Sequence, residues 1–132
     1  MRLNQVTAAT HDLDASIAFY RLLGLRLIVK SDRYARFELP RGDATFSLHV
    51  VEGRIPSENA PQLYFEVEDV DREVERLQQA GVAFERAPAQ QPWLWYEAWL
   101  ADPAGNAICI YRAGENRRRP PWRIESSSPA GN

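Results

Sequence analysis

The chain has 132 residues, the length of one compact domain, so separate cofactor and substrate domains are excluded. Hydrophobic residues make up 45% and charged residues 26% of the sequence, which supplies a core and excludes global disorder. A net charge of −2 and a pI near 5.7 give no electrostatic reason to bind nucleic acid or an anionic membrane, and we expect a small molecule or another protein as the partner.

The single cysteine, Cys109, cannot form an internal disulfide, and the sequence offers no cysteine cluster for a structural zinc ion. The first residues lack the apolar stretch of a signal peptide. No apolar run approaches the roughly 18 residues that a membrane span needs. We therefore expect a cytoplasmic protein.

An internal repeat organises the predicted elements. A shift of 57 positions pairs residues 5–24 with residues 62–81 without a gap, and the apolar positions of the two copies coincide. We interpret the pattern as a duplicated supersecondary unit. Four pairs are identical: Gln5 with Gln62, Asp12 with Asp69, Asp14 with Asp71, and Gly24 with Gly81.

Each copy begins with a strand that leads into a helix. In the second copy Leu63, Phe65 and Val67 alternate with other residues, and apolar residues then recur at helical spacing from Val70 to Leu77. Asp12 or Asp14 can cap the start of the first helix. Asp69 or Asp71 can cap the start of the second. Gly24 and Gly81 can end these helices in a left-handed conformation.

Three further strands are predicted after each helix, so both copies have the order βαβββ. The predicted strands cover 25–29, 34–39 and 44–51 in the first copy, and 82–85, 93–100 and 107–111 in the second. We expect a first module over 1–57, a second over 58–113, and an Arg- and Pro-rich tail over 114–132. The last eight residues are expected to be disordered, whereas Trp122 and Ile124 are expected to dock onto the domain or a partner subunit.

Three segments carry a resemblance to a known family. Residues 12–24, DLDASIAFYRLLG, are similar to the D-L-x-x-S-x-x-F-Y-x-x-x-L-G signature of the vicinal oxygen chelate superfamily, with one residue fewer before the final L-G. Residues 65–70 and 102–106 extend the likeness. This superfamily includes glyoxalases, extradiol dioxygenases and bleomycin resistance proteins. The resemblance implies an α+β fold of two tandem βαβββ modules, whose curled mixed sheets surround a shared cleft with the helices outside, and it implies a homodimer.

The same resemblance assigns four cleft positions that hold a divalent metal ion in metal-dependent members. They are occupied here by Gln5, Ser47, Gln62 and Cys109. Neutral amides and hydroxyls are weak ligands for such a cation, so these positions are degenerate and we expect no metal cofactor. A site rescued by His49 and a Cys109 thiolate is the less favoured alternative, as is a nucleophilic Cys109, which needs a depressed pKa.

Tryptophans alternate along the predicted strand over 93–100. Trp93, Trp95 and Trp99 would therefore share one face. If that face lines the cleft, it is a platform for flat or cationic ligands, with negative charge from Glu38, Glu66 or Glu97. If it packs against a helix or a second subunit, Tyr96 and Ala98 face the cleft instead.

The leading functional hypothesis is a metal-independent, glyoxalase- or bleomycin-resistance-like protein that binds a small basic or aromatic molecule. The competing hypothesis is a metal-dependent lyase, isomerase or dioxygenase, in which Gln5 and Gln62 hold the ion and Glu66 or Glu97 acts as base or ligand. A structural or regulatory protein without a pocket is the third. The candidate ligand-binding residues are Gln5, Ser47, His49, Gln62, Tyr64, Glu66, Trp95, Glu97, Trp99 and Cys109.

Overall fold

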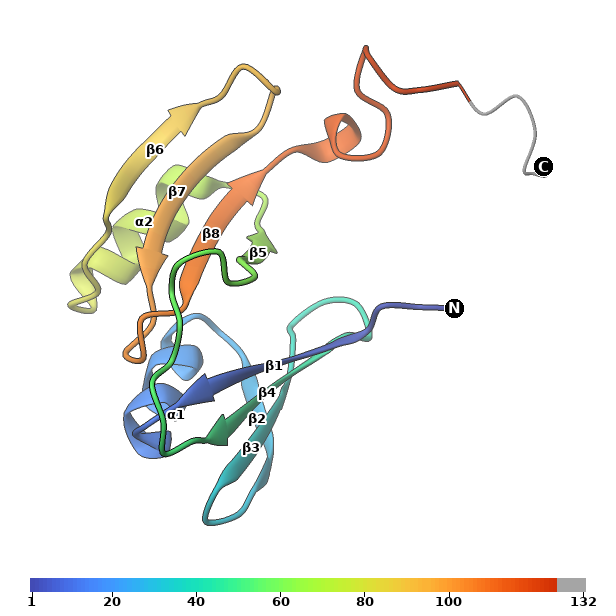
Figure 1. Cartoon of the computed structure of the whole chain (residues 1–132). Coiled ribbons are helices and arrows are strands. Elements are labelled where there is room, and N and C mark those ends of the chain that lie inside the picture. Colours follow the sequence, from blue (N-terminus) through green and yellow to red (C-terminus); the bar gives the residue numbers. More distant parts are fainter. Residues whose placement is uncertain (126–132) are drawn as a thin grey trace.

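The computed structural model describes residues 1–125, which form two four-stranded sheets, each covered on one face by a helix (Figure 1). The first repeat contributes β1 (Gln5–Thr10), α1 (Leu13–Leu22), β2 (Arg26–Lys30), β3 (Tyr34–Glu38) and β4 (Thr45–Val50). The second contributes β5 (Leu63–Glu66), α2 (Val70–Gln79), β6 (Arg86–Gln90), β7 (Tyr96–Ala101) and β8 (Ala107–Arg112), and the 3-10 helix η1 (Gly114–Asn116) follows. The predicted α+β fold of two tandem βαβββ units is confirmed. The disorder expected for the last eight residues, 125–132, falls on residues 126–132 except at its first position, and residues 126–132 lie outside the described residues.

The two sheets have the same topology. Their strand orders are β1-β4-β3-β2 and β5-β8-β7-β6, with one parallel pair in each, β1 with β4 and β5 with β8. Phe46 and Leu48 of β4 pack with α1, and Ala98 of β7 packs with α2. Side chains alternate along each strand, so the residues between these point to the opposite side. We call the side of each sheet that turns away from its helix the non-helical face.

The helix ends follow from the paired residues of the repeat. The side chains of Asp12 and Asp69 accept hydrogen bonds from the backbone N–H of Ala15 and Arg72, both at 3.1 Å. Both helices are followed by a glycine in the left-handed region, with φ of 102° at Gly24 and 95° at Gly81. Neither helix of the described chain has the length and apolar character of a membrane span.

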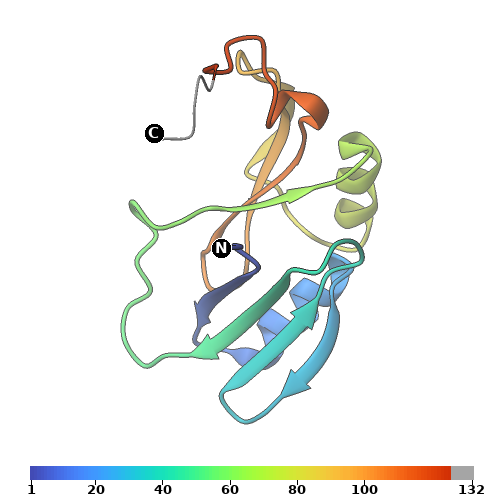
Figure 2. The same cartoon turned by 90° about the vertical axis from the view of Figure 1, so that its right-hand side faces the viewer.

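The turn between β7 and β8 joins the two units. The buried carboxylate of Asp102 accepts a 2.6 Å hydrogen bond from the hydroxyl of Tyr20 in α1. The amide of Asn106 donates to the carbonyl of Ala9 in β1 at 3.0 Å. Residues of both sheets share one apolar core, and the connection over residues 51–62 runs along the side opposite α2 (Figure 2).

Two predicted strands of the second unit are corrected. Residues 82–85 form no strand: Val82 and Phe84 pack against the core, but β6 begins only at Arg86. The strand predicted over 93–100 begins at Tyr96, because a tight turn precedes it. In that turn Leu94 has a φ of 69° and its N–H donates to the Gln91 carbonyl at 3.0 Å. Trp93 therefore lies in the turn and not on the strand. The other strand ends lie within one residue of the predicted ones.

Candidate functional site

Four aromatic rings gather on the non-helical face of the second sheet. They belong to Tyr64 in β5, Trp95 directly before β7, Trp99 in β7 and Tyr111 in β8, and we call them the aromatic cluster. The rings of Trp95 and Tyr111 stack with centroids 4.7 Å apart and an interplanar angle of 18°. Tyr64 meets the other three edge-on, at centroid distances of 5.5 to 5.8 Å. Both arrangements are favourable for aromatic pairs.

Strand register assembles this cluster and settles the facing of the tryptophans. Cys109 pairs with Tyr64 on one side and with Trp99 on the other, so these three share the non-helical face. Tyr96 and Ala98 face α2 instead: Ala98 is fully buried against it, and the Tyr96 hydroxyl donates to Asp71 at 2.6 Å. The alternative in which the Trp face packs against the helix is therefore wrong.

A carboxylate lies among these rings. Glu97 is only 3% exposed, and its two oxygens accept hydrogen bonds from the indole N–H of Trp93 at 2.7 Å and of Trp99 at 3.1 Å. Within residues 1–125, no basic side chain forms an ion pair with it. The guanidinium of Arg86 lies over the ring of Trp99, 5.0 Å from its centroid. This region therefore combines π faces with a buried negative charge.

The Cys109 thiol is fully buried in the same region. Burial first, and then the charge of Glu97, raise the pKa of this thiol to about 12. A nucleophilic cysteine or a thiolate ligand needs the opposite shift. The observed environment keeps the thiol protonated and suits a packing residue.

Two other predicted residues border the aromatic cluster. The carboxylate of Glu66 accepts hydrogen bonds from the backbone N–H of Ala113 and Gly114, both at 2.8 Å. The Gln62 side chain accepts a 3.1 Å hydrogen bond from the hydroxyl of Tyr64. Glu66 thus anchors the segment that leads into η1, which places η1 beside the stacked Trp95 ring.

The remaining predicted residues lie on the non-helical face of the first sheet. Gln5 accepts a 2.7 Å hydrogen bond from Thr45, Ser47 is fully buried and hydrogen-bonded to Tyr34 at 2.7 Å, and the side chain of His49 is exposed. Glu38 is also on this sheet, paired with Arg26, and does not join the aromatic cluster. The predicted set is thus divided into two groups, one on each sheet.

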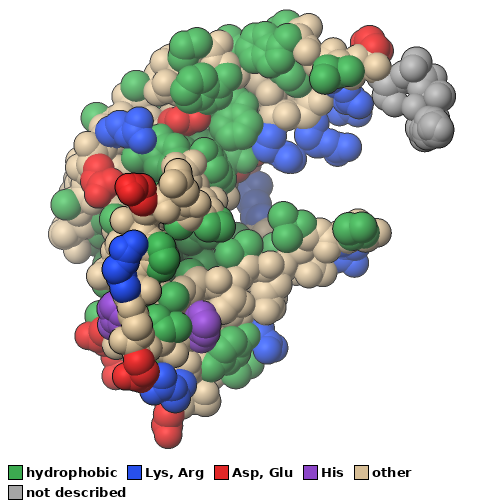
Figure 3. Space-filling model, in the orientation of Figure 1, with side chains coloured by type: hydrophobic (Ala, Val, Ile, Leu, Met, Phe, Trp, Pro, Cys, Tyr) green, Lys and Arg blue, Asp and Glu red, His purple; other side chains and the backbone are tan. Residues whose placement is uncertain are grey.

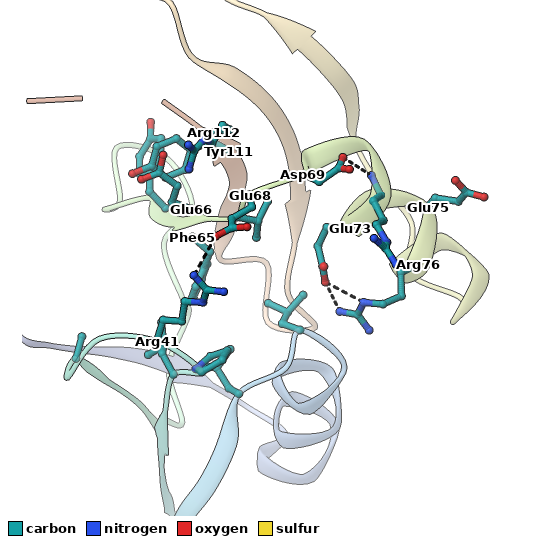
Figure 4. Close-up of a pocket in the computed structure, with 18 of the residues that line it drawn as sticks. Arg41, Phe65, Glu66, Glu68, Asp69, Glu73, Glu75, Arg76, Tyr111 and Arg112 are labelled. Atoms are coloured by element: carbon teal, nitrogen blue, oxygen red, sulfur yellow. Dashed lines mark hydrogen bonds and ion pairs between the residues drawn. The ribbon is translucent and has the colours of Figure 1, made fainter. Parts of the chain in front are cut away.

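A cleft of about 1270 Å³ lies between the two units. Tyr64, Glu66 and Tyr111 line one part of it, and the segment around Pro40 in the turn before β4 lines another. An ion pair between Arg41 and Glu68, 2.9 Å long, crosses from the first unit to the second (Figure 4). The space-filling view shows the molecule hollowed between its upper and lower parts, with basic side chains on the upper wall (Figure 3).

Tyr111 and Arg41 were missing from the predicted site. Tyr111 follows the alternation that places Cys109 on the non-helical face, so the strand pattern contains the signal for it. The turn residue Arg41 carries no such signal, because its neighbour Glu68 is distant in the sequence and meets it only through the packing of the two units.

The four positions assigned to metal ligands do not fit a divalent cation. The amide oxygens of Gln5 and Gln62 already accept hydrogen bonds on different sheets, and the Ser47 hydroxyl is buried against Tyr34. The Cys109 thiol is held protonated. Across residues 1–125, no three side chains of His, Cys, Asp or Glu come together as a possible metal site.

Comparison with known families gives one match. The model of the Glyoxalase/Bleomycin resistance protein/Dioxygenase superfamily matches residues 2–110. No curated protein matches the chain.

Solved structures share the fold. An antibiotic-binding protein, TnmS3 from Streptomyces sp. CB03234, is 24% identical with a TM-score of 0.74, over 86% of this chain and 96% of that one. A bleomycin-binding protein in complex with bleomycin is 19% identical with a TM-score of 0.69, over 85% and 98% of the two chains. A lactoylglutathione lyase from Agrobacterium tumefaciens is 22% identical with a TM-score of 0.67, over 93% and 97%. At these identities the likeness shows the fold, which hosts both binding and catalysis.

Proposed function

Because the chain belongs to the glyoxalase/bleomycin resistance protein/dioxygenase superfamily, we propose that it binds a small organic molecule on the aromatic cluster without a metal ion. The observation that carries this proposal is the buried carboxylate of Glu97, which lies between the indoles of Trp93 and Trp99 and has no basic partner among residues 1–125. A negative charge held inside an aromatic surface favours a ligand that is flat and positively charged.

Two contacts support this ligand class. Arg86 already places a cation over the π face of Trp99, so this ring accepts such a group. Tyr64 is 44% exposed although it meets three rings edge-on, and it gives a ligand access to the cluster. A basic aromatic molecule would exchange with Arg86 and lie against Trp99 and Tyr64.

Sequestration is the mode of action that fits these residues best. Holding a ligand needs affinity and no reacting group, whereas a metal-dependent lyase, isomerase or dioxygenase needs a ligand set that Gln5, Ser47, Gln62 and Cys109 do not provide. Two solved structures with the same fold are described as binding bleomycin or an antibiotic. We propose the same role here, for a basic aromatic compound.

We further propose that the protein works as a cytoplasmic homodimer. Large apolar side chains remain exposed in one copy of the chain, among them Leu3 at 91% and Ile124 at 88%. We expect a second copy of the chain to cover these side chains. Light scattering that gives the mass of a single chain at micromolar concentration would refute the dimer.

Two tryptophan variants test the binding site. Wild-type protein is titrated with metal-free bleomycin, acriflavine and ethidium while tryptophan fluorescence is recorded. We expect at least one compound to quench it saturably, Trp95→Ala to weaken that binding by about tenfold, and Trp122→Ala to leave it unchanged, because Trp122 is an exposed residue of the tail. The proposal fails if no compound quenches, or if the two variants behave alike.

A further inference from the structure

A second polar centre lies on the non-helical face of the first sheet. The hydroxyl of Tyr34 is 2.7 Å from the hydroxyl of Ser47 and accepts a 2.9 Å hydrogen bond from Nε of Arg36. Tyr34 and Arg36 are alternate residues of β3, and Ser47 is opposite Arg36 on β4. Strand register therefore places all three on one face.

The guanidinium of Arg36 keeps free donors in this arrangement. Its Nε binds Tyr34, while its two terminal nitrogens make no hydrogen bond or ion pair within the part of the chain that the structure describes. The side chain is half-buried, and the nearby carboxylate of Glu38 is paired with Arg26 at 3.3 Å. Because Nε is occupied by Tyr34, the two terminal nitrogens, unpaired among the described residues, present one edge that matches the geometry of a carboxylate.

The phenol of Tyr34 adds a donor to the same place. Its hydrogen bonds with Ser47, first, and with Arg36 lower the pKa of Tyr34. Either hydroxyl can donate in the Tyr34–Ser47 pair. When Ser47 donates, the phenol O–H is free to donate to a ligand. Ser47 is fully buried, and its hydrogen bond with the phenol oxygen holds the Tyr34 ring in position.

We propose that Arg36 and Tyr34 form a binding site for the carboxylate group of a small organic molecule, with Ser47 as a positioning residue. This site is separate from the aromatic cluster, because it lies on the other sheet and has the opposite charge preference. Carboxylate binding by Arg36 and Tyr34 does not depend on cation binding by the aromatic cluster.

Amide chemical shifts test this site directly. Protein labelled with ¹⁵N is titrated with sodium benzoate and, in parallel, with benzyl alcohol, which has the ring without the charge. We expect saturable shifts at the amides of Arg36 and Ser47 with benzoate and none with benzyl alcohol. Equal responses to the two probes, or no saturable shift with benzoate, would overturn the proposal.

Matched variants test whether the charge of Arg36 is the one that binds benzoate. Arg36→Met should weaken benzoate binding by about tenfold, and Tyr34→Phe should weaken it to a smaller extent. Arg26→Met is the control, since Arg26 is an arginine of the same sheet that is already paired with Glu38. Unchanged spectra outside the first sheet verify that each variant is folded. Equal benzoate affinity of Arg36→Met and Arg26→Met would also overturn the proposal.

Discussion

The indole N–H of Trp99 donates a 3.1 Å hydrogen bond to the carboxylate of Glu97, and both residues are buried within one β-strand. Trp93, in the turn before that strand, donates to the other carboxylate oxygen at 2.7 Å. Two indoles thus satisfy a charge that no basic side chain of residues 1–125 neutralises. These two hydrogen bonds connect the turn before β7 and the strand itself with the aromatic cluster.

Replacing Glu97 by glutamine should destabilise the protein. An amide offers one acceptor and one donor group, so one indole N–H would face another donor and lose its partner. We expect the free energy of unfolding to fall by about 1–3 kcal/mol in urea titrations. The control is Glu85→Gln, a substitution of an exposed residue directly before β6, which should change it by less than about 0.5 kcal/mol. Equal effects of the two substitutions would contradict this role of Glu97.

Removing the Tyr20 hydroxyl should weaken the link between the two units. Tyr20→Phe leaves the buried Asp102 carboxylate with one donor fewer, and we expect a loss of about 1–3 kcal/mol in the free energy of unfolding. The control is Tyr96→Phe, which removes an exposed hydrogen bond to Asp71 and should cost less than about 1 kcal/mol. Urea unfolding followed by circular dichroism measures both. A Tyr96 effect as large as the Tyr20 effect would count against the link.

The Cys109 thiol should make stability depend on pH in alkaline solution. Its pKa is about 12 in the folded protein and near the ordinary value of 9.0 when unfolded. Between these values the unfolded chain releases a proton that the folded chain keeps, so the free energy of unfolding falls as the pH rises. We expect a steeper fall from about pH 8 to about pH 10 in wild-type protein than in Cys109→Ala. Equal pH slopes for wild-type protein and Cys109→Ala would show that folding does not raise the pKa of this thiol.

Two truncations separate the roles of the C-terminal segment. Removing residues 114–132 deletes the Gly114 N–H that binds Glu66 and the Asn116 carbonyl that binds Trp95, so the melting temperature should fall. Removing residues 120–132 keeps both contacts, so it should lower the melting temperature by less than the longer truncation does. The shorter truncation removes the exposed Trp122 and Ile124, and we expect light scattering to give the mass of one truncated chain. A mass of two truncated chains would refute a role of these side chains in dimer formation.

The repeat made the fold predictable from the sequence. Alternation, helical spacing, the capping aspartates and the terminal glycines are local signals, and each recurs in both units. The start of β7 was not predictable in the same way, because the turn depends on a left-handed Leu94, a conformation that a leucine rarely adopts.

The candidate site was predictable only in part. Alternation predicted that Trp95 and Trp99 share one face of their strand, but not which face this is, since this depends on strand register. The burial of Glu97 by two indole N–H groups and the contact of Arg36 with Tyr34 depend on side-chain geometry, which spacing along the chain does not contain.

Isothermal titration calorimetry of chelator-treated protein tests the central claim most directly. The protein is titrated with metal-free bleomycin, acriflavine and ethidium, and in separate runs with Ni²⁺, Zn²⁺, Fe²⁺ and Mn²⁺. Binding on the aromatic cluster without a metal ion predicts saturable heat with at least one organic compound and no stoichiometric metal binding. Tight binding of one metal ion per chain, with organic compounds bound only after the metal is added, would contradict it.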